Sequence, residues 1–254
     1  MTDIIIETRN LGIDFGGLTA VNNLSLEVCQ NEIVGLIGPN GAGKTTVFNL
    51  LTKVYEPTRG SVILCGEDLK KANTIEANIK GIARTFQNIR LFNKLTVIEN
   101  VKSAMSNLYK YSVFDSLLHT KKYHECEKQI EGKAVELLRI FDLYEFRDLY
   151  ASSLPYGAQR RLEIARALAC NPKALLLDEP AAGMNPQETD QLMKTIKFVR
   201  DKFNIAILLI EHDMNLVMNI CERIYVLNYG TLLAKGSPDD IMNNPDVIKA
   251  YLGD

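Results

Sequence analysis

The chain has 254 residues, and its 29 basic and 31 acidic residues give a net charge of −2. This balance provides no general electrostatic footprint for nucleic acid, so we expect no nucleic-acid partner. The longest apolar runs are far shorter than the roughly 20 residues that cross a bilayer. The N-terminus also lacks the pattern of a secretory signal. These features predict a cytoplasmic protein that crosses no membrane by itself.

In chain order, the first expected element is an antiparallel flap. Residues 4–28 alternate apolar and polar side chains around the turn Gly16-Gly17. Three strand-length apolar runs follow at residues 33–37, 174–177 and 205–210, each before a polar loop and a helical pattern. Such runs indicate a parallel sheet that is buried on both faces.

A mostly helical segment separates the first of these strands from the other two. Residues 97–169 place apolar side chains at helical spacing, for example at Ala134, Leu137, Leu138 and Phe141. We therefore expect one domain over residues 1–254, with a core at about 1–87 and 170–254 and an inserted helical subdomain at about 88–169.

A glycine-rich motif directly follows the strand at residues 33–37. It reads G-x-x-x-x-G-K-T, and a helical pattern follows it, which is the context that a phosphate-binding loop requires. Backbone N–H groups and the helix N-terminus would hold ATP phosphates, Lys44 would bridge the β and γ phosphates, and Thr45 would offer its hydroxyl to Mg²⁺. The predicted nucleotide-binding residues of this segment are Gly38, Pro39, Asn40, Gly41, Ala42, Gly43, Lys44, Thr45 and Thr46. The alternative is a chance glycine turn.

Further polar residues follow strands of the predicted sheet. Asp178 and Glu179 end the second apolar run, where open α/β sheets bind ligands. Asp178 is the expected Mg²⁺ partner, and Glu179 is placed to polarise the attacking water. The alternative is that this pair caps the helix near Pro186. His212 follows the third run and is a candidate partner of the γ-phosphate.

Gln87 lies where the core gives way to the helical segment. Its neutral amide is a candidate contact for Mg²⁺ or water. The predicted catalytic residues are Glu179, His212, Gln87 and Lys44, and the predicted metal-binding residues are Thr45, Gln87 and Asp178.

With these motifs in place, the chain resembles the ABC transporter ATPase family over essentially its whole length. The most specific marker is Leu154-Pro155-Tyr156-Gly157-Ala158, which stands where the family has its L-S-G-G-Q signature, just before a helix. The resemblance implies an α/β fold with a P-loop NTPase core, a mostly parallel sheet, an N-terminal antiparallel β-subdomain and an inserted helical subdomain. It also implies a head-to-tail dimer in which each signature contacts the ATP bound by the opposite subunit.

The signature segment departs from the family pattern. Pro155 replaces Ser, Tyr156 replaces the first Gly and Ala158 replaces Gln, which leaves Gly157 and the helix N-terminus as the expected phosphate donors. By resemblance, Phe15 is the aromatic residue that stacks on adenine. The alternative for Phe15 is a core anchor.

Several segments are similar to one ATPase subunit of branched-chain amino-acid importers. They are residues 83–92, 154–157, 181–186, 211–214 and 244–253. The resemblance implies ATP hydrolysis coupled to transport, integral-membrane permease partners, a second ATPase subunit in a heterodimer or homodimer, and a peripheral location on the inner face of the membrane. Alternatives are a related ATPase of urea import or lipopolysaccharide export, a non-transport ABC ATPase, and a nucleotide-gated scaffold without catalysis.

Overall fold

The computed structural model describes residues 3–109 and 112–252. Three residues that the sequence analysis used lie outside the described ranges. They are Met1 and Thr2 at the N-terminus and Gly253 in the C-terminal segment. The chain divides into two compact units, one of residues Met1–Gln87 and Lys173–Asp254 and the other of residues Asn88–Pro172. The expected fold class is confirmed, with antiparallel and mostly parallel sheets in the first unit and helices in the second.

The larger sheet of the first unit has six strands in the order β10-β9-β3-β8-β7-β6. Their bounds are β3 Ile33–Ile37, β6 Ile82–Arg84, β7 Ala174–Asp178, β8 Ala206–Ile210, β9 Arg223–Asn228 and β10 Thr231–Gly236. All neighbours are parallel except β9 and β10, which form an antiparallel hairpin. Every residue of β3, β7 and β8 is buried, as continuous apolar runs predict for a sheet covered on both faces.

The predicted flap is a four-stranded antiparallel sheet. It contains β1 Ile4–Phe15, β2 Leu18–Cys29, β4 Arg59–Leu64 and β5 Glu67–Asp68, in the order β2-β1-β4-β5. The β1–β2 turn lies at Gly16 and Gly17, which both adopt positive φ angles that favour glycine. The expectation of a hairpin here is confirmed.

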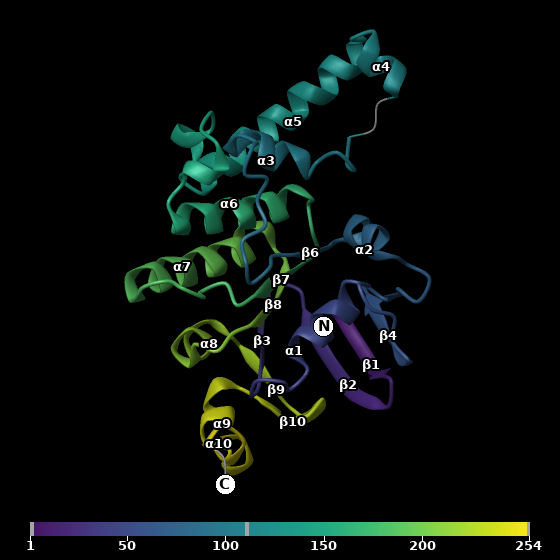
Figure 1. The fold of residues 1–254 in the computed structure, drawn as a ribbon, viewed down its shortest axis with the longest axis vertical. Helices are drawn as coiled ribbons and strands as arrows, with labels where there is room; N and C mark the ends of the chain where they lie inside the picture. The colour runs from purple at the N-terminus through teal and green to yellow at the C-terminus, as the bar shows by residue number, and fades with distance from the viewer. Residues whose placement is uncertain (1–2, 110–111, 253–254) are drawn as a thin grey trace. The chain divides into compact units, whose positions relative to one another are not determined.

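Six helices of the described first unit surround these sheets. They are α1 Lys44–Leu51, α2 Thr74–Lys80, α7 Pro186–Phe203, α8 Met214–Ile220, α9 Pro238–Met242 and α10 Pro245–Leu252. Figure 1 shows α1 between strand β3 and the flap strands, with α8 on the other side of β3. Buried apolar side chains from both sheets and from α1 form one hydrophobic core. Helix α1 contributes Val47, Phe48, Leu50 and Leu51, which are fully buried. This packing holds the start of α1 at the carboxyl ends of the parallel strands.

The second unit is helical, as expected. It contains α3 Val97–Ser103, α4 Val113–Leu117, α5 Lys121–Ile140, α6 Tyr156–Ala169 and 3₁₀ turns at Tyr144–Phe146 and Ala151–Ser153. Helix α5 buries Ile130, Ala134, Leu137 and Leu138, which follow the predicted apolar stripe. Among the described residues, no helix is both long enough and apolar enough to span a bilayer.

The alternative reading of the acidic pair as a helix cap is wrong. Asp178 ends β7, and the cap of α7 is Asn185, whose side chain accepts a hydrogen bond from the Glu188 N–H in a capping box.

Candidate functional site

The glycine-rich loop connects β3 to α1 in the backbone form that phosphate binding needs. Gly38 has φ 150°, and a Cβ there would lie 2.1 Å from the Leu227 carbonyl oxygen. Gly43 has φ 99°, and a Cβ there would lie 2.7 Å from the Ala20 carbonyl oxygen. Any side chain at either position would therefore collide with backbone that cannot move freely, so both glycines are needed for the curl of the loop.

Lys44 lies inside the curl of this loop. Its Nζ donates to the carbonyl oxygens of Gly38, at 2.6 Å, and Pro39, at 3.0 Å. Burial lowers the pKa of the ammonium, while the negative charges of Glu179 and Asp178 oppose that shift. The cation is thus held where phosphate oxygens can replace the two carbonyl groups as its partners.

A hollow of about 400 Å³ opens over the loop. Its lining comes from the end of the flap, the loop with the start of α1, the ends of β7 and β8, and the β9–β10 turn. The lining residues are Leu18, Thr19, Ala20, Asn40, Gly41, Ala42, Gly43, Lys44, Thr45, Thr46, Glu179, His212, Tyr229 and Gly230. Most of the predicted phosphate-binding residues, Lys44 included, therefore share one concave surface with the predicted catalytic residues Glu179 and His212.

Three predicted catalytic residues meet at Glu179. Its Oε2 accepts a hydrogen bond from Gln87 Nε2 at 2.6 Å, and its Oε1 lies 3.0 Å from His212 Nε2. These side chains come from separate segments, after β6, β7 and β8. Glu179 has φ 45°, a left-handed conformation that is uncommon for residues other than glycine and is often found at active sites.

The predicted metal-binding carboxylate has a partner that the sequence expectations missed. Asp178 Oδ2 accepts a hydrogen bond from Arg84 at 2.7 Å, and both side chains are buried. Arg84 also donates to Asn49 Oδ1 and lies over the rings of Phe48 and Phe86. The sequence offered one signal for this ion pair, because Arg84 is a cationic residue at the end of β6, the strand next to β7. The pair keeps Asp178 at the edge of the phosphate-binding loop.

Two other predicted site residues belong to other parts of the chain. Phe15 is 42% exposed at the end of β1 and contacts Tyr55 edge-on, with ring centroids 5.3 Å apart. It is not among the described residues that line the hollow. Gly157 lies in the first turn of α6, in the second unit.

Comparisons with known proteins decide the family. The family model described as ABC transporter matches residues 21–182, and a second model, described as branched-chain amino acid ATP-binding cassette transporter, matches residues 231–254. The high-affinity branched-chain amino acid transport ATP-binding protein LivG of Escherichia coli K12 is 49% identical, with both chains covered completely. The chain belongs to the ABC transporter ATP-binding family.

Other relatives agree with this assignment. BraF of Pseudomonas aeruginosa, with the same description as LivG, is 46% identical over 254 residues, which is all of both chains. The lipopolysaccharide export ATP-binding protein LptB of Haemophilus influenzae is 35% identical and covers 98% of each chain. A crystal structure of an ATP-binding cassette of an ABC transporter in its ADP conformation superposes with a TM-score of 0.85 at 30% identity, covering 99% of each chain. This chain is therefore an ABC ATPase that binds ATP and hydrolyses it to power transport.

A buried carboxylate that sequence analysis missed organises the loops beside the predicted catalytic residues Glu179 and His212. Glu211 accepts hydrogen bonds from the backbone N–H groups of Ala181 at 2.7 Å, His212 at 3.0 Å and Asp213 at 3.4 Å. Burial nevertheless raises the pKa of its carboxyl group. The residue thus joins the segment after Glu179 to the segment that carries His212.

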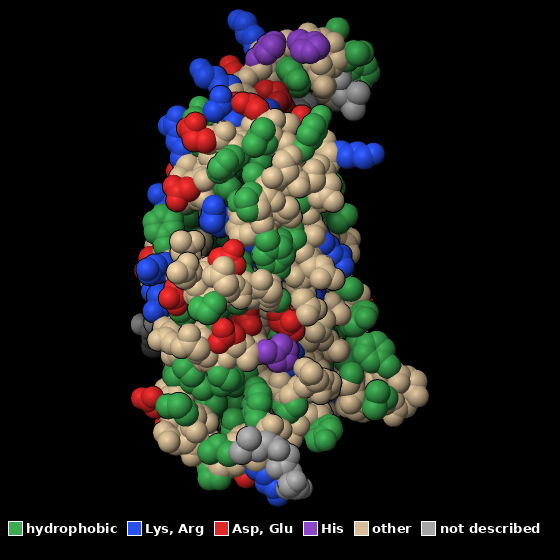
Figure 2. Space-filling model, turned by 60° about the vertical axis from the view of Figure 1, so that its left-hand side comes forward, with side chains coloured by type: hydrophobic (Ala, Val, Ile, Leu, Met, Phe, Trp, Pro, Cys, Tyr) green, Lys and Arg blue, Asp and Glu red, His purple; other side chains and the backbone are tan. Residues whose placement is uncertain are grey.

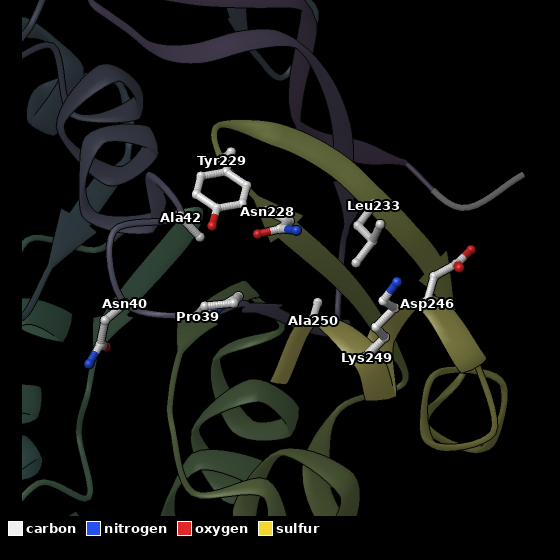
Figure 3. A pocket seen from close by; sticks show the side chains of 9 residues that line it. All are labelled: Pro39, Asn40, Ala42, Asn228, Tyr229, Leu233, Asp246, Lys249 and Ala250. Carbon is white, nitrogen blue, oxygen red and sulfur yellow. The ribbon is translucent and has the colours of Figure 1, made fainter. Parts of the chain in front are cut away.

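A second hollow, of about 390 Å³, lies on the other side of the phosphate-binding loop. Figure 3 shows Asp246 and Lys249 of α10 across this hollow from Pro39 and Ala42. Burial raises the pKa of the Tyr251 hydroxyl, also on α10, and the backbone of Gly38 opposes that shift. The β9–β10 turn supports the same loop, because the Gly230 N–H donates to the Ala42 carbonyl oxygen at 3.0 Å.

The signature segment begins α6 without a conventional cap. Pro155 occupies the cap position, and within the described residues no side chain bonds there to the first-turn N–H groups of α6. Gln159 Nε2 instead donates back to the Leu154 carbonyl oxygen at 2.8 Å. Deeper in the helix, Arg160 and Glu163 form a buried ion pair at 2.7 Å, which sequence analysis also missed.

Proposed function

We propose that this ABC ATPase energises import of branched-chain amino acids. The observation that supports this cargo most directly is the full-length, 49% identity to a branched-chain amino acid transport ATP-binding protein. The match of residues 231–254 to a family model named for the same cargo adds to it. The alternatives are ATPases of urea import or of lipopolysaccharide export, and an LptB is 35% identical.

Reconstitution tests this cargo. The chain would be combined with the permeases, the second ATPase subunit and the binding protein encoded beside it, in liposomes that contain ATP. Uptake of leucine or isoleucine, but not of urea, is the expected result. Urea uptake, or no uptake of any branched-chain amino acid while another cargo moves, would contradict the proposal.

The residues of the first unit suit separate roles in ATP hydrolysis. Lys44 and the backbone of residues 38–46 hold the phosphates, as the curl of the loop and its lining of the hollow support. Glu179 accepts the proton of the attacking water, and Gln87 and His212 orient its carboxylate through the contacts described above. In this arrangement His212 also lies beside the incoming γ-phosphate. Phe15 and Tyr55 together offer an aromatic surface for adenine.

Thr45, Gln87 and Asp178 form a donor set that suits Mg²⁺. A hydroxyl, an amide and a carboxylate are hard oxygen ligands, and Thr45 lines the phosphate-binding hollow. Mg²⁺ bound with ATP would neutralise charge on the phosphates. The buried Arg84 keeps the Asp178 carboxylate oriented through their 2.7 Å ion pair.

The partners that fit this role are integral-membrane permeases and a second ATPase subunit. A solved dimer of an ATP-binding cassette with ADP and Pi has a TM-score of 0.76 to this chain at 25% identity, covering 92% of this chain and 99% of that one. The signature departures at Pro155, Tyr156 and Ala158 favour a heterodimer, in which a different subunit supplies the stronger signature. Through the permeases, the protein would lie on the cytoplasmic face of the membrane.

The segment after Gln87 is the proposed permease contact. Phe92 is 54% exposed, and Arg166 lies over its ring at 5.4 Å. An exposed apolar side chain that follows Gln87 closely in the chain suits a coupling surface. Replacing Leu91 and Phe92 by Ser should uncouple transport while ATPase activity without permeases stays intact. Equal loss of both activities would instead identify them as core residues.

A further inference from the structure

Helix α4 carries a small, strongly exposed apolar surface, which we call the α4 tip. It consists of Phe114, Leu117 and Leu118, which are 75%, 73% and 71% exposed. Their spacing of three and four residues places them on one face of the helix and its C-terminal cap. Single exposed apolar side chains are ordinary, but three large ones on one turn indicate a surface that another phase or molecule covers.

The turn that carries the tip is well defined by local hydrogen bonds. Ser112 and Asp115 form a capping box at the start of α4. The Asp115 carboxylate also accepts hydrogen bonds from the hydroxyls of Ser112 and Thr120, at 2.7 Å and 2.9 Å. The hydrogen bonds of Ser112, Asp115 and Thr120 therefore fix the conformation of the turn that exposes the apolar side chains of the tip.

The tip stands away from the packed part of its own unit. Helix α5 follows directly, and none of its residues 121–129, all of which are described, is buried. Packing of α5 begins only at Ile130. Figure 1 accordingly shows α4 at the free end of α5. The unit itself leaves the tip uncovered.

The rim of the tip is cationic. Lys121 and Lys122 are exposed at the start of α5, and the exposed His119 and His124 lie nearby, with ring centroids 6.1 Å apart. Asp115 is the one acidic side chain among residues 112–124, its charge lies near Lys122, and the exposed Glu125 follows on α5, so the two lysines and these two carboxylates share the surface behind the apolar side chains. The upper end of Figure 2 shows hydrophobic, lysine and histidine side chains together over α4 and the start of α5.

We propose that the α4 tip inserts into the surface of an anionic lipid bilayer. Apolar side chains on one helical face with lysines beside them are the composition of interfacial membrane anchors. Lysines near an anionic leaflet attract it, and a convex apolar turn can enter the headgroup region without a preformed groove. The chain would thus contact the membrane directly, in addition to any contact through permeases.

Vesicle binding by the full-length chain in the absence of permeases tests this proposal. Flotation with phosphatidylcholine vesicles and with mixed phosphatidylcholine–phosphatidylglycerol vesicles should show binding mainly to the anionic set. Phe114→Ser with Leu117→Ser should reduce this partitioning at least about tenfold, since two large apolar side chains no longer leave water. Lys121→Gln with Lys122→Gln should reduce it by about fivefold per lysine at low salt.

Ile75→Ser with Ile79→Ser is the matched control, because these residues are 63% and 55% exposed on α2 in the other unit. This pair should leave partitioning unchanged, and all variants should retain the ATPase activity of the isolated chain.

A fluorescent reporter gives a second measurement that does not depend on loss of binding. The chain contains no tryptophan, so Phe114→Trp introduces a single one. Its emission should shift to shorter wavelength with anionic vesicles and be quenched by brominated acyl chains. Phe198→Trp, on α7, should show neither change.

Two results would overturn the proposal. One is the absence of both flotation and spectral shift with anionic vesicles. The other is normal lipid binding by the Phe114→Ser, Leu117→Ser variant. If the same variant instead fails only to assemble with purified permeases in detergent, the tip is a protein-docking surface and the lipid proposal is wrong. Neither result bears on the proposed cargo, because the vesicles contain no permease.

Discussion

Glu179 combines an uncommon backbone conformation with two side-chain partners. Its φ of 45° costs on the order of 1–3 kcal/mol for such residues, so the surrounding structure must hold it. Gln87 and His212 supply that hold on the side chain, one at each carboxylate oxygen. The arrangement directs a carboxylate from the end of β7 toward the phosphate-binding hollow.

Replacing Glu179 by Gln should separate ATP binding from hydrolysis. The amide keeps the shape and can still accept from Gln87, but it cannot take a proton from water. We expect near-normal ATP affinity and turnover that falls by about 10² or more, measured by nucleotide binding and phosphate release. Size-exclusion chromatography with ATP should show more dimer. Turnover at the wild-type rate would remove Glu179 from the catalytic role.

Glu211 predicts a specific pH dependence of stability. Because burial raises its pKa in the folded chain above the ordinary 4.5, the unfolded chain loses the proton first as the pH rises. The folded state is therefore destabilised, relative to low pH, between the ordinary pKa and the raised one. A Glu211→Gln variant cannot titrate at this position, so it lacks this loss.

Urea unfolding from about pH 4 upward would measure this effect, since unperturbed glutamates titrate near there. The free energy of unfolding of Glu211→Gln minus that of the wild type should rise with pH across the window and then level off. A constant offset is also expected, because the new NH₂ group would face backbone donors. Glu125→Gln, at an exposed position, should show no such slope. Parallel profiles for Glu211→Gln and the wild type would refute the prediction.

At the scale of elements, the phosphate-binding loop is supported from outside by a hairpin and a helix. The β9–β10 turn bonds to the Ala42 carbonyl, and a Cβ at Gly230 would lie 2.5 Å from the Ala20 carbonyl oxygen. Helix α10 approaches the loop at Gly38 through Tyr251. Helix α10 therefore borders the phosphate-binding loop across the second hollow, although none of its described residues lines the main hollow.

Tyr251→Phe should weaken ATP binding without abolishing turnover. The variant keeps the ring but loses the hydroxyl that interacts with the Gly38 backbone, and a hydrogen bond of this kind is worth about 0.5–1.5 kcal/mol. We expect the KM for ATP to rise about 2–10-fold while kcat changes little, measured in steady-state assays. Tyr150→Phe, which removes an exposed hydroxyl in the second unit, is the control. An unchanged KM would show that α10 does not position the loop.

At the scale of the whole molecule, each of the two units carries part of an ATP site. The phosphate-binding loop, Glu179 and His212 belong to the first unit, and the signature segment with Gly157 belongs to the second. In the head-to-tail dimer that we propose, a partner subunit would supply the signature to this loop. The weak cap at Pro155 would then affect the partner's site rather than the site of this chain.

This division predicts unequal sites in a heterodimer. We expect low ATPase activity for this chain alone and a clear increase when a second ATPase subunit with a complete signature is added, measured by phosphate release at fixed total protein. Restoring the family residues with Pro155→Ser and Tyr156→Gly should raise the activity of the isolated chain. Full transport by this subunit and the permeases without a second ATPase would contradict the heterodimer.

Local sequence pattern was sufficient for strands β3, β7 and β8, the flap hairpin and the phosphate-binding loop, but β4, β5, β6, β9 and β10 were not predicted. Continuous apolar runs and glycines that need positive φ angles carry their information within a few residues, as β3 and Gly38 to Thr45 illustrate. The acidic pair after β7 was also identifiable, because carboxylates at the carboxyl end of a buried strand are rarely accidental beside such a loop.

Tertiary structure decided which side chains meet. Arg84 pairs with Asp178 across 94 residues, and Glu211 bonds to Ala181 across 30, so neither contact has a local signature. The β6–β7 pairing and the loops after β7 and β8 create them, because parallel strands bring distant segments to one edge of the sheet. The burial of Asp178 and Glu211 also results from this packing of distant segments. The sequence pattern placed Glu179, Gln87 and His212 at strand ends or boundaries. Only the packed sheet brings the side chains of Gln87 and His212 to the Glu179 carboxylate.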